Sequence, residues 1–394
     1  MAASAAAVLG LAVLNRRLYE PDRVDTAVAQ LRFLAKSLEE GGAERMQSAF
    51  PEGYVFTWAL YGLASAQVAR ALPPGDARRG EALRAARAAV AQVGSERAKA
   101  SFEREMEPEY GAFYASWSLY LRGAVLRASG AGGPAPFDLG EYERDCDRFA
   151  AALSGSASPF LASYPEAAWP ADTAVGVAGL AACGSAFGDR YRPVIARWVR
   201  AVRGRRDPGL GAIPHAARSA DGMPLGGARG ESLALLSYVL VDVDPVLARE
   251  QYEALRRGFV DYAWGVPGVR EYPHGVDGRG DIDSGPIVLG FGGPATVVGA
   301  GAAIANGDEE LGATLLAAAE VLGFPVEIAG RRRYAGGYLP VGDAFLAWAR
   351  TAPPAPRHVR YPPAVPRWWR LPVHALSLVL GALALRAALA ARSP

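Results

Sequence analysis

The stretch Arg270-Glu271-Tyr272-Pro273-His274-Gly275 opens the part of the chain on which the fold assignment depends. It continues to Ser284-Gly285-Pro286 and includes three further acids, Asp277, Asp281 and Asp283. An almost uncharged run that we expect to be helical, residues 287–305, follows at once. Loops on rigid scaffolds carry function, and the N-terminus of a helix offers free N–H groups. We therefore expect this Gly- and Pro-rich loop to be a place for chemistry.

The same order of an amphipathic run, a loop and a mostly apolar run recurs along the chain. In residues 25–38 the apolar side chains fall at helical spacing, whereas residues 54–69 are apolar nearly all round. The amphipathic runs, expected to face outward, are residues 25–38, 79–93, 141–153, 191–202, 245–260 and 309–322. The mostly apolar runs, expected to be buried, are residues 54–69, 110–126, 172–187, 231–241, 287–305 and 339–349.

This self-similarity is the strongest indication of the fold, because a repeat decides the architecture before any local motif does. The loops from amphipathic to apolar runs are long, which is typical of functional loops, and all six should emerge at one end. Alternating exposed and buried helices that close sixfold describe an α/α toroid. We see no alternating strand pattern of useful length. The prediction is an all-α (α/α)6 toroid of six helical hairpins over residues 23–350.

Composition excludes some classes of function. The chain has 394 residues, 51% of them hydrophobic, with a net charge of +2, so it can bury a large core and shows no sign of binding nucleic acid. Cys146 and Cys183 stand far apart, with no CxxC motif and no metal spacing. We therefore expect neither a disulfide framework nor a metal site, and Cys183 is expected to be a small hydrophobe within a buried helix. No motif calls for a cofactor.

Both ends of the chain are apolar. In the N-terminal segment, residues 1–22, the run 2–14 is too short to span a bilayer. Residues 351–370 form a Pro/Arg-rich linker, and residues 371–394 contain a run long enough to span, behind a Trp368-Trp369 pair that resembles an interfacial anchor. We expect a C-terminal membrane helix; the alternative is an ordinary helix packed on the domain. By the positive-inside rule, a cytoplasmic domain is indicated by Arg16, Arg17, Arg357, Arg360, Arg367 and Arg370.

The long loops and the first turns of the apolar runs form a rim that collects polar and aromatic side chains. We expect a pocket there, and we select Asp172 and Asp283 as its acid/base pair, with Glu166 and Asp281 as substitutes. Rings can stack on sugar faces, and the other groups can bind hydroxyl or carboxylate groups. The expected substrate-binding residues are Tyr164, Trp169, His215, Arg229, Arg270, Tyr272, His274, Tyr334 and Tyr338.

A structural role remains open for several of these residues. Asp172 and Asp283 each precede an expected helix, where Asp is a favoured N-cap. Asp281 can serve merely as a cap or as a partner of Arg279, and Trp169 and Tyr272 can plug the core. The sequence Gly290-Phe291-Gly292-Gly293-Pro294-Ala295 matches a dinucleotide-binding fingerprint, but no strand precedes it, so we assign it to helix packing, with Pro294 as a source of a kink.

Six helical hairpins with carboxylates on the loop-bearing face resemble the (α/α)6 superfamily of six-hairpin glycosidases and toroid polysaccharide lyases. The segments 164–172 and 281–286, together with the hydrophobic tail, are also similar to the linalool dehydratase/isomerase-like proteins, which are membrane-associated toroids. The resemblance covers the architecture of about residues 23–350 and carries over no catalytic position. It implies an active site in the central funnel of the toroid.

Three functions are compatible with this reasoning. The first is an enzyme that acts on a carbohydrate or glycoconjugate near a membrane. The second is a lyase or isomerase on an apolar alcohol, for which a narrow aliphatic pocket would be evidence. The third is a non-catalytic toroid that binds a glycan or peptide, for which rim acids neutralised by arginines would be evidence. The expected partners are a small-molecule or glycan substrate and the membrane.

Overall fold

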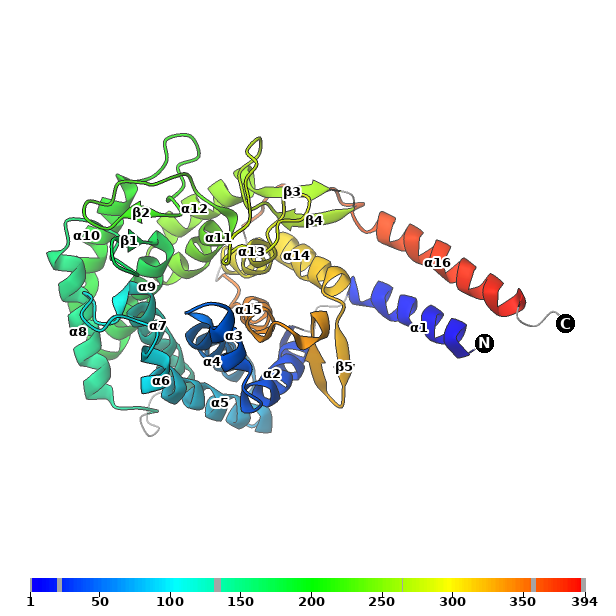
Figure 1. Cartoon of the computed structure of the whole chain (residues 1–394), viewed down its shortest axis with the longest axis horizontal. Coiled ribbons are helices and arrows are strands. Elements are labelled where there is room, and N and C mark those ends of the chain that lie inside the picture. The colour runs from blue at the N-terminus through cyan, green and yellow to red at the C-terminus, as the bar shows by residue number, and fades with distance from the viewer. Residues whose placement is uncertain (1, 20–22, 131–135, 264, 356–358, 391–394) are drawn as a thin grey trace.

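The chain folds into a mostly helical domain from which two helices project (Figure 1). The computed structural model describes the chain except residues 1, 20–22, 131–135, 264, 356–358 and 391–394. The amphipathic runs form the helices α2 (Arg23–Glu39), α5 (Ala77–Val93), α8 (Leu139–Gly155), α10 (Arg192–Arg203), α12 (Pro245–Gly258) and α14 (Glu309–Leu322). The mostly apolar runs form α4 (Gly53–Ala71), α7 (Gly111–Ser129), α9 (Pro170–Phe187), α11 (Gly230–Val239), α13 (Gly293–Ala305) and α15 (Pro340–Arg350).

The mostly apolar helices pack on one another in chain order. α4 contacts α7, α7 contacts α9, α9 contacts α11, α11 contacts α13, and α13 contacts α15. α15 then returns to α4, so the first and last of these helices are neighbours. Small residues allow the close approach. A Cβ on Gly179 of α9 would meet the backbone of α7 at 2.9 Å, and one on Gly176 would meet the ring of Phe149 at 2.1 Å. Trp117 and Trp348 are fully buried where α7 and α15 meet, with ring centroids 6.0 Å apart.

The loops that lead into these helices meet at one end of the domain. The N–H of Ala112, at the start of α7, donates to the carbonyl of Ala162 in the next loop. That loop in turn pairs with the following one, because β1 (Ala167–Ala168) and β2 (Ala217–Arg218) are antiparallel partners. Gly230, at the start of α11, donates to the carbonyl of Glu271 at 2.8 Å. Side chains of distant loops are therefore brought together.

The loops contain short elements that the sequence reasoning did not predict. These are α3 (Gly42–Ala49), α6 (Glu96–Lys99), the 3-10 turns η1 (Asp189–Tyr191), η2 (Leu240–Asp242) and η3 (Ala335–Gly337), and the hairpins β3 (Val260–Ala263)–β4 (Val266–Val269) and β5 (Val326–Ile328)–β6 (Arg331–Arg333). The hairpins extend two of the long loops. β6 packs on α2, and β4 packs on α13 and α14.

One helix begins later than expected. Residues 287–292 were predicted to be helical, but α13 begins at Gly293. Leu289 and Gly290 have φ values of 55° and 84°, and the backbones of Val288 and Phe291 pair as an isolated bridge. Left-handed backbone ends a right-handed helix, so these apolar residues belong to the loop. Pro294 lies in the first turn of α13, where proline needs no kink, and the expectation of a kink is wrong.

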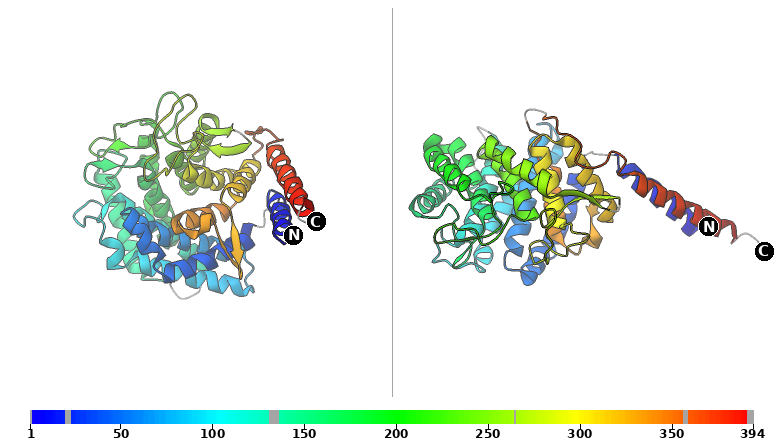
Figure 2. Two further views of the ribbon diagram at one scale, coloured as in Figure 1. Left: turned by 45° about the vertical axis from the view of Figure 1, so that its right-hand side comes forward. Right: turned by 90° about the horizontal axis from the view of Figure 1, so that it is seen from above.

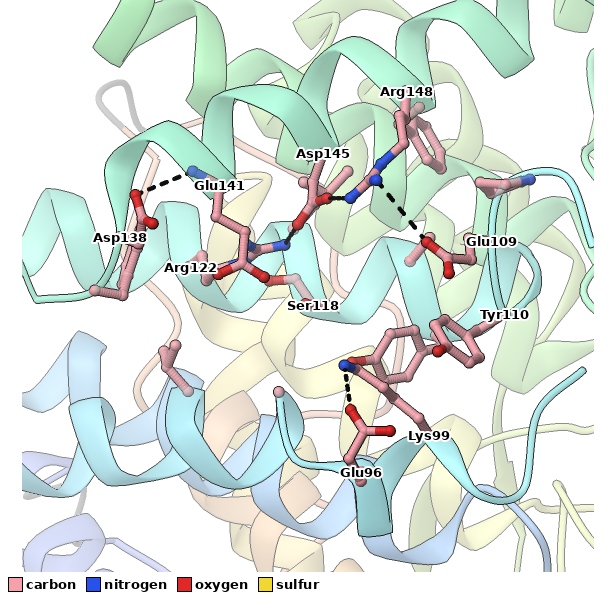
Figure 3. A pocket seen from close by; sticks show the side chains of 18 of the residues that line it. Glu96, Lys99, Glu109, Tyr110, Ser118, Arg122, Asp138, Glu141, Asp145 and Arg148 are labelled. Atoms are coloured by element: carbon pink, nitrogen blue, oxygen red, sulfur yellow. Dashed lines mark hydrogen bonds and ion pairs between the residues drawn. The ribbon is translucent and has the colours of Figure 1, made fainter. Parts of the chain in front are cut away.

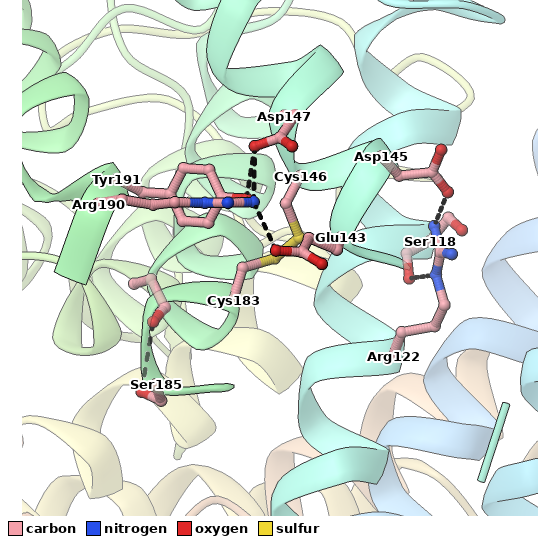
Figure 4. Close-up of a disulfide and its surroundings, with 11 residues drawn as sticks. Ser118, Arg122, Glu143, Asp145, Cys146, Asp147, Cys183, Ser185, Arg190 and Tyr191 are labelled. Carbon is pink, nitrogen blue, oxygen red and sulfur yellow. Dashed lines mark hydrogen bonds and ion pairs between the residues drawn. A yellow bond between two sulfur atoms is a disulfide. The ribbon is translucent and has the colours of Figure 1, made fainter. Parts of the chain in front are cut away.

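Cys146 and Cys183 form a disulfide, contrary to the expectation from their spacing (Figure 4). Cys146 lies on α8 and Cys183 on α9, so the bond joins the two helices of one pair, and both residues are fully buried. Sequence distance misled the prediction because antiparallel packing brings residues far apart in the chain side by side. Cys183 is therefore neither a free small hydrophobe nor an available nucleophile.

The C-terminal part first packs on the domain and then leaves it. Tyr361, in the expected linker, contacts the ring of Tyr252 with centroids 5.4 Å apart, and Trp369 is buried with Leu18 and Ala317. Trp369 is therefore a core residue of the domain and not an interfacial anchor, while Trp368 is exposed. α16 (Leu371–Ala390) then projects into solvent alongside α1 (Ala2–Arg17), as both views in Figure 2 show. α16 is the described helix that is long and apolar enough to cross a membrane.

Candidate functional site

Asp172 lies at the rim, where α9 begins. It is the third residue of that helix, whose N-cap is Trp169, and its Oδ2 accepts a hydrogen bond of 2.6 Å from the hydroxyl of Ser163. Desolvation raises the pKa of Asp172 to about 7; the Ser163 hydrogen bond opposes this, and the negative charges of Asp283 and Glu52 add to it. Asp172 is therefore no N-cap, and it holds a proton in the neutral pH range.

Asp283 reaches the same region from the loop before α13. Helix α13 begins at Gly293, so Asp283 is not its cap either. Its own N–H donates to Asp281 Oδ1 at 3.1 Å, which fixes this turn of the loop. Asp283 is exposed to solvent, yet desolvation by the surrounding protein, followed by the charges of Asp281 and Glu52, raises its pKa to about 6. Its carboxyl is therefore accessible to a substrate.

Glu52 and Tyr164 complete this group. Glu52 directly precedes α4 and accepts a hydrogen bond from the Tyr164 hydroxyl. Burial, and then the hydrogen bond to Glu52, raise the pKa of Tyr164 far above its ordinary value. The ring of Tyr164 meets Trp169 edge-on, with centroids 5.8 Å apart. The sequence reasoning selected Tyr164 and Trp169 but gave Glu52 no role, although its position just before an apolar helix was a usable signal.

Arg229 binds two neighbouring acids, Glu271 and Asp281. Its Nε donates to Glu271 Oε1 at 2.8 Å, its Nη1 binds Asp281, and its guanidinium lies 5.2 Å from the centre of the Tyr272 ring. Glu271 is fully buried, and desolvation raises its pKa to about 7 in spite of Arg229. The pKa of Asp281 is shifted in the opposite direction. Desolvation is outweighed by Arg229 and by the hydrogen bonds from Ser284, and the pKa falls to about 2. Asp281 is therefore a permanently ionised partner of Arg229.

His215 lies near Arg229, since both face Glu231 Oε1, which is 3.6 Å from Arg229 Nε. Its Nδ1 is 2.6 Å from the hydroxyl of Ser232 and 3.4 Å from Glu231 Oε1. Burial, and then the positive charge of Arg229, lower the pKa of His215 to about 4, so the imidazole is neutral at neutral pH. Both carboxyl oxygens of Glu231 are buried without a hydrogen-bond partner in the described part of the chain. The sequence reasoning gave neither Glu231 nor Glu271 a role.

Other selected residues lie apart from this group. Glu166 is exposed, with a φ of 63°. Arg270 and His274 both face Asp261 of β3, at 3.4 and 3.7 Å. Tyr334 is buried in a network in which its hydroxyl donates to Glu320 Oε1 at 2.6 Å and accepts from Arg350 at 2.9 Å. Tyr338 is 84% exposed. Arg270, His274 and Tyr334 therefore have partners within the protein.

A separate cavity of about 540 Å³ lies between α5, α6, α7 and α8 (Figure 3). Most of its charged side chains bind one another. Arg122 binds Asp145 at 2.6 Å, Lys99 binds Glu96 at 2.9 Å, and Arg148 bridges Asp145 and Glu109. None of the residues selected from the sequence lines it. Because these charges are already paired, they leave little unsatisfied polarity for a ligand.

The group around Asp172 and Asp283 has the chemistry of an acid and a base. The pKa of Asp172 is raised to about 7, and that of Asp283, which lies in a different loop, to about 6, so Asp283 gives up its proton more readily. General acid and general base catalysis uses two groups that differ in proton affinity in this way.

Across the described residues, no group of three or more His, Cys, Asp or Glu side chains is arranged to hold a metal ion. No protein-family model matches the chain, and no curated protein matches it as a relative.

Proposed function

We propose that the domain is an (α/α)6 toroid whose rim carries the active site of an acid/base enzyme. The arrangement is supported by the contacts that run from α4 through α13 and return from α15 to α4. The site is supported by the loops that meet at the end where the mostly apolar helices begin. In this proposal Asp172 donates a proton to the leaving group, and Asp283 accepts one from the attacking water.

We assign the roles of acid and base from the effect of the Asp283 charge on the pKa of Asp172. The charge of Asp283 contributes to the raised pKa of Asp172, so Asp283 ionises first and Asp172 retains its proton. The negative charge of Glu52 helps to raise the pKa of both Asp172 and Asp283, and a hydrogen bond from Tyr164 holds Glu52 in place. A base that ionises near pH 6 and an acid that ionises near pH 7 are matched to work near neutrality.

The charge of the site favours a neutral, hydroxylated substrate. Around Asp172 and Asp283 lie further acids, Glu52, Glu231, Glu271 and Asp281, and the arginine among them is already bound to Glu271 and Asp281. An anionic sugar would meet repulsion there, which disfavours uronate elimination. Trp169 and Tyr164 supply aromatic surface beside the acids. A neutral carbohydrate or glycoconjugate, hydrolysed with water activated by Asp283, is the substrate class that fits best.

A second candidate is dehydration or isomerisation of an apolar alcohol. It is favoured by the aliphatic side chains on the loop that carries Asp283: Ile282 is 65% exposed, Val288 63% and Leu289 52%. A protonated carboxyl can protonate an alcohol as well as a glycosidic oxygen. The non-catalytic alternative is disfavoured because neither Asp172 nor Asp283 binds an arginine directly in the described part of the chain.

The test is a turnover assay on a panel of neutral glycosides and short-chain allylic alcohols, with products identified by NMR. The proposal predicts hydrolysis of a glycoside, a bell-shaped pH dependence with limbs near pH 6 and 7, and loss of activity in Asp283→Asn. Asp277→Asn is the matched control, since that side chain is fully exposed on the same loop. Turnover of alcohols alone would favour the second candidate. Activity that Asp283→Asn leaves intact would contradict both.

A further inference from the structure

The first and last described helices form a pair. α1 and α16 run side by side away from the domain, and the first residues of α1 and the last of α16 lie at the same far end (Figures 1 and 2). Near the domain Asn15 meets His374, and further out Leu11 lies against Gly381, where an added Cβ would be 3.9 Å from Leu11 Cδ1. The pairing is therefore antiparallel.

The outer surface of this pair is aliphatic. On α16 the exposed side chains include Leu376, Leu378, Val379, Leu383 and Leu385, and on α1 they include Leu9, which is 67% exposed. A helix of 20 residues is about 30 Å long, and one of 16 residues is about 24 Å. The longer helix matches a hydrocarbon core of about 30 Å, and the shorter one crosses it with local thinning of the bilayer. Exposure of such an aliphatic surface to water is unfavourable, and its burial in lipid hydrocarbon is favourable.

The base of the pair is fixed to the domain. Leu18 and Trp369 are buried together with Ala317 of α14. The guanidinium of Arg370 donates to the carbonyl of Leu18 at 3.2 Å and lies over the rings of Tyr19 and Trp369. His374 binds the hydroxyl of Tyr19 at 2.6 Å through Nε2, and Asn15 through Nδ1. The polar groups between the two helices therefore bind one another, as helix pairs in membranes require.

We propose that α1 and α16 enter a lipid bilayer together as an antiparallel hairpin that holds the disulfide-bearing domain on the non-cytoplasmic side. The hairpin crosses with the first residues of α1 and the last of α16 on the cytoplasmic side. The domain's base is then at the membrane surface, because Trp369 and Leu18 join it directly to both helices.

We assign the domain to the non-cytoplasmic side of the membrane because it contains a disulfide. Cys146 and Cys183 are buried and bonded, and bonds of this kind persist in oxidising compartments, while cytosolic thiols are kept reduced. In forming the bond, the two thiols lose two protons and two electrons to a disulfide-carrying oxidant of that compartment. The arginines on the domain side indicate the opposite orientation by the positive-inside rule. Arg370 weakens that argument, because its charge serves contacts within the protein. Arg386 lies toward the far end of α16, where the rule expects it.

The test uses the full chain in a bacterial host with an epitope tag at each end. Protease added outside spheroplasts is expected to cleave the domain and to leave both tags intact until the membrane is permeabilised. A protected domain would overturn the assigned side. A domain and N-terminal tag that are both cleaved, with the C-terminal tag protected, would overturn the joint insertion of α1. Thiol-reactive reagent applied to denatured chains without reductant should label neither cysteine, and labelling of both would contradict the assigned compartment.

Matched substitutions on α1 and α16 test the membrane insertion of each helix separately. Leu9→Arg places a charge on the lipid-facing surface of α1 and should lower the fraction of protein that resists an alkaline carbonate wash severalfold. Leu378→Arg on α16 should act in the same way. Val246→Arg is the control, because Val246 is 62% exposed on α12, away from the base of the helix pair. An unchanged fraction for Leu9→Arg together with a lowered fraction for Leu378→Arg would show that α16 inserts alone and would overturn the proposal.

Discussion

The negative charge of Asp283 contributes to holding the proton on Asp172, although Asp172 lies in α9 and Asp283 in the loop before α13. Desolvation is the larger cause, and the second acid adds to it. Each carboxyl also feels Glu52, which directly precedes α4. Three loops that lie far apart in the sequence therefore set the proton affinity of one side chain. This coupling is the property that a simple helix cap would not have.

Asp283→Asn is expected to remove most turnover while changing the melting temperature little. Asparagine keeps the shape of the side chain but cannot exchange a proton, and loss of a general base typically lowers the rate roughly 10²–10⁴-fold. The rate constant of the variant on an identified substrate, beside its melting curve, checks this. If the two acids act together, the double variant with Asp172→Asn should be scarcely slower than either single variant. Near-full activity of Asp283→Asn would contradict the assignment of Asp283 as the base.

Asp172→Asn is expected to stabilise the protein at pH 8 but not at pH 4. The folded pKa of about 7 lies above the ordinary value of 3.8, so the folded state keeps a proton that the unfolded chain has lost between these pH values. The stability that this proton provides is lost as the pH rises from 3.8 to about 7, and asparagine avoids the loss. Urea unfolding at both pH values should show a gain of roughly 1–3 kcal/mol at the higher one. An equal effect at both would contradict the raised pKa.

Arg229→Met is expected to destabilise the protein, most strongly at high pH. The substitution leaves Glu271 fully buried without its cation, and breaking a buried pair costs about 3–5 kcal/mol. At low pH Glu271 takes up a proton and the cost falls. Adding Glu271→Leu should restore much of the stability at pH 8. Arg200→Met, on the exposed face of α10, is the control for the loss of an arginine. If Arg229→Met unfolds no more easily than this control, Arg229 does not hold the site together.

Replacing both cysteines, Cys146→Ala with Cys183→Ala, is expected to lower the free energy of unfolding by about 2–4 kcal/mol, because the bond constrains the unfolded chain. Reductant should destabilise the wild-type protein by a similar amount and leave the double variant unaffected. Denaturant unfolding with and without reductant measures both effects. A wild-type protein that is indifferent to reductant would show that the two sulfurs are not bonded in solution.

The helices of the domain could be predicted from the sequence because burial leaves a periodic trace. Residues 54–69 are apolar nearly all round, and α4 is buried on most sides. The same signal failed at residues 287–292, where Val288 and Leu289 look like a helix in composition but occupy a turn with left-handed backbone. Apolar composition does not distinguish a buried helix from a rim loop that exposes aliphatic side chains. The short strands escaped prediction because elements of two to four residues have no measurable period.

The candidate site could be predicted only in part. Asp172, Asp283, Tyr164, Trp169, His215, Arg229 and Tyr272 were selected, and the structure brings them to the same end of the domain. Glu52 and Glu271 were not, since their importance depends on which loops meet. The pairing of Cys146 with Cys183 escaped prediction for the same reason: spacing along the chain says nothing about which faces of α8 and α9 touch.

The most direct test is the pKa of Asp172, measured by carbon NMR of selectively labelled aspartate carboxyls, assigned with Asp172→Asn. Our account predicts a value near 7 in the wild-type protein and a lower value in Asp283→Asn, because the neighbouring negative charge is then absent. An Asp172 that titrates near its ordinary 3.8 in both proteins would contradict the acid/base pair.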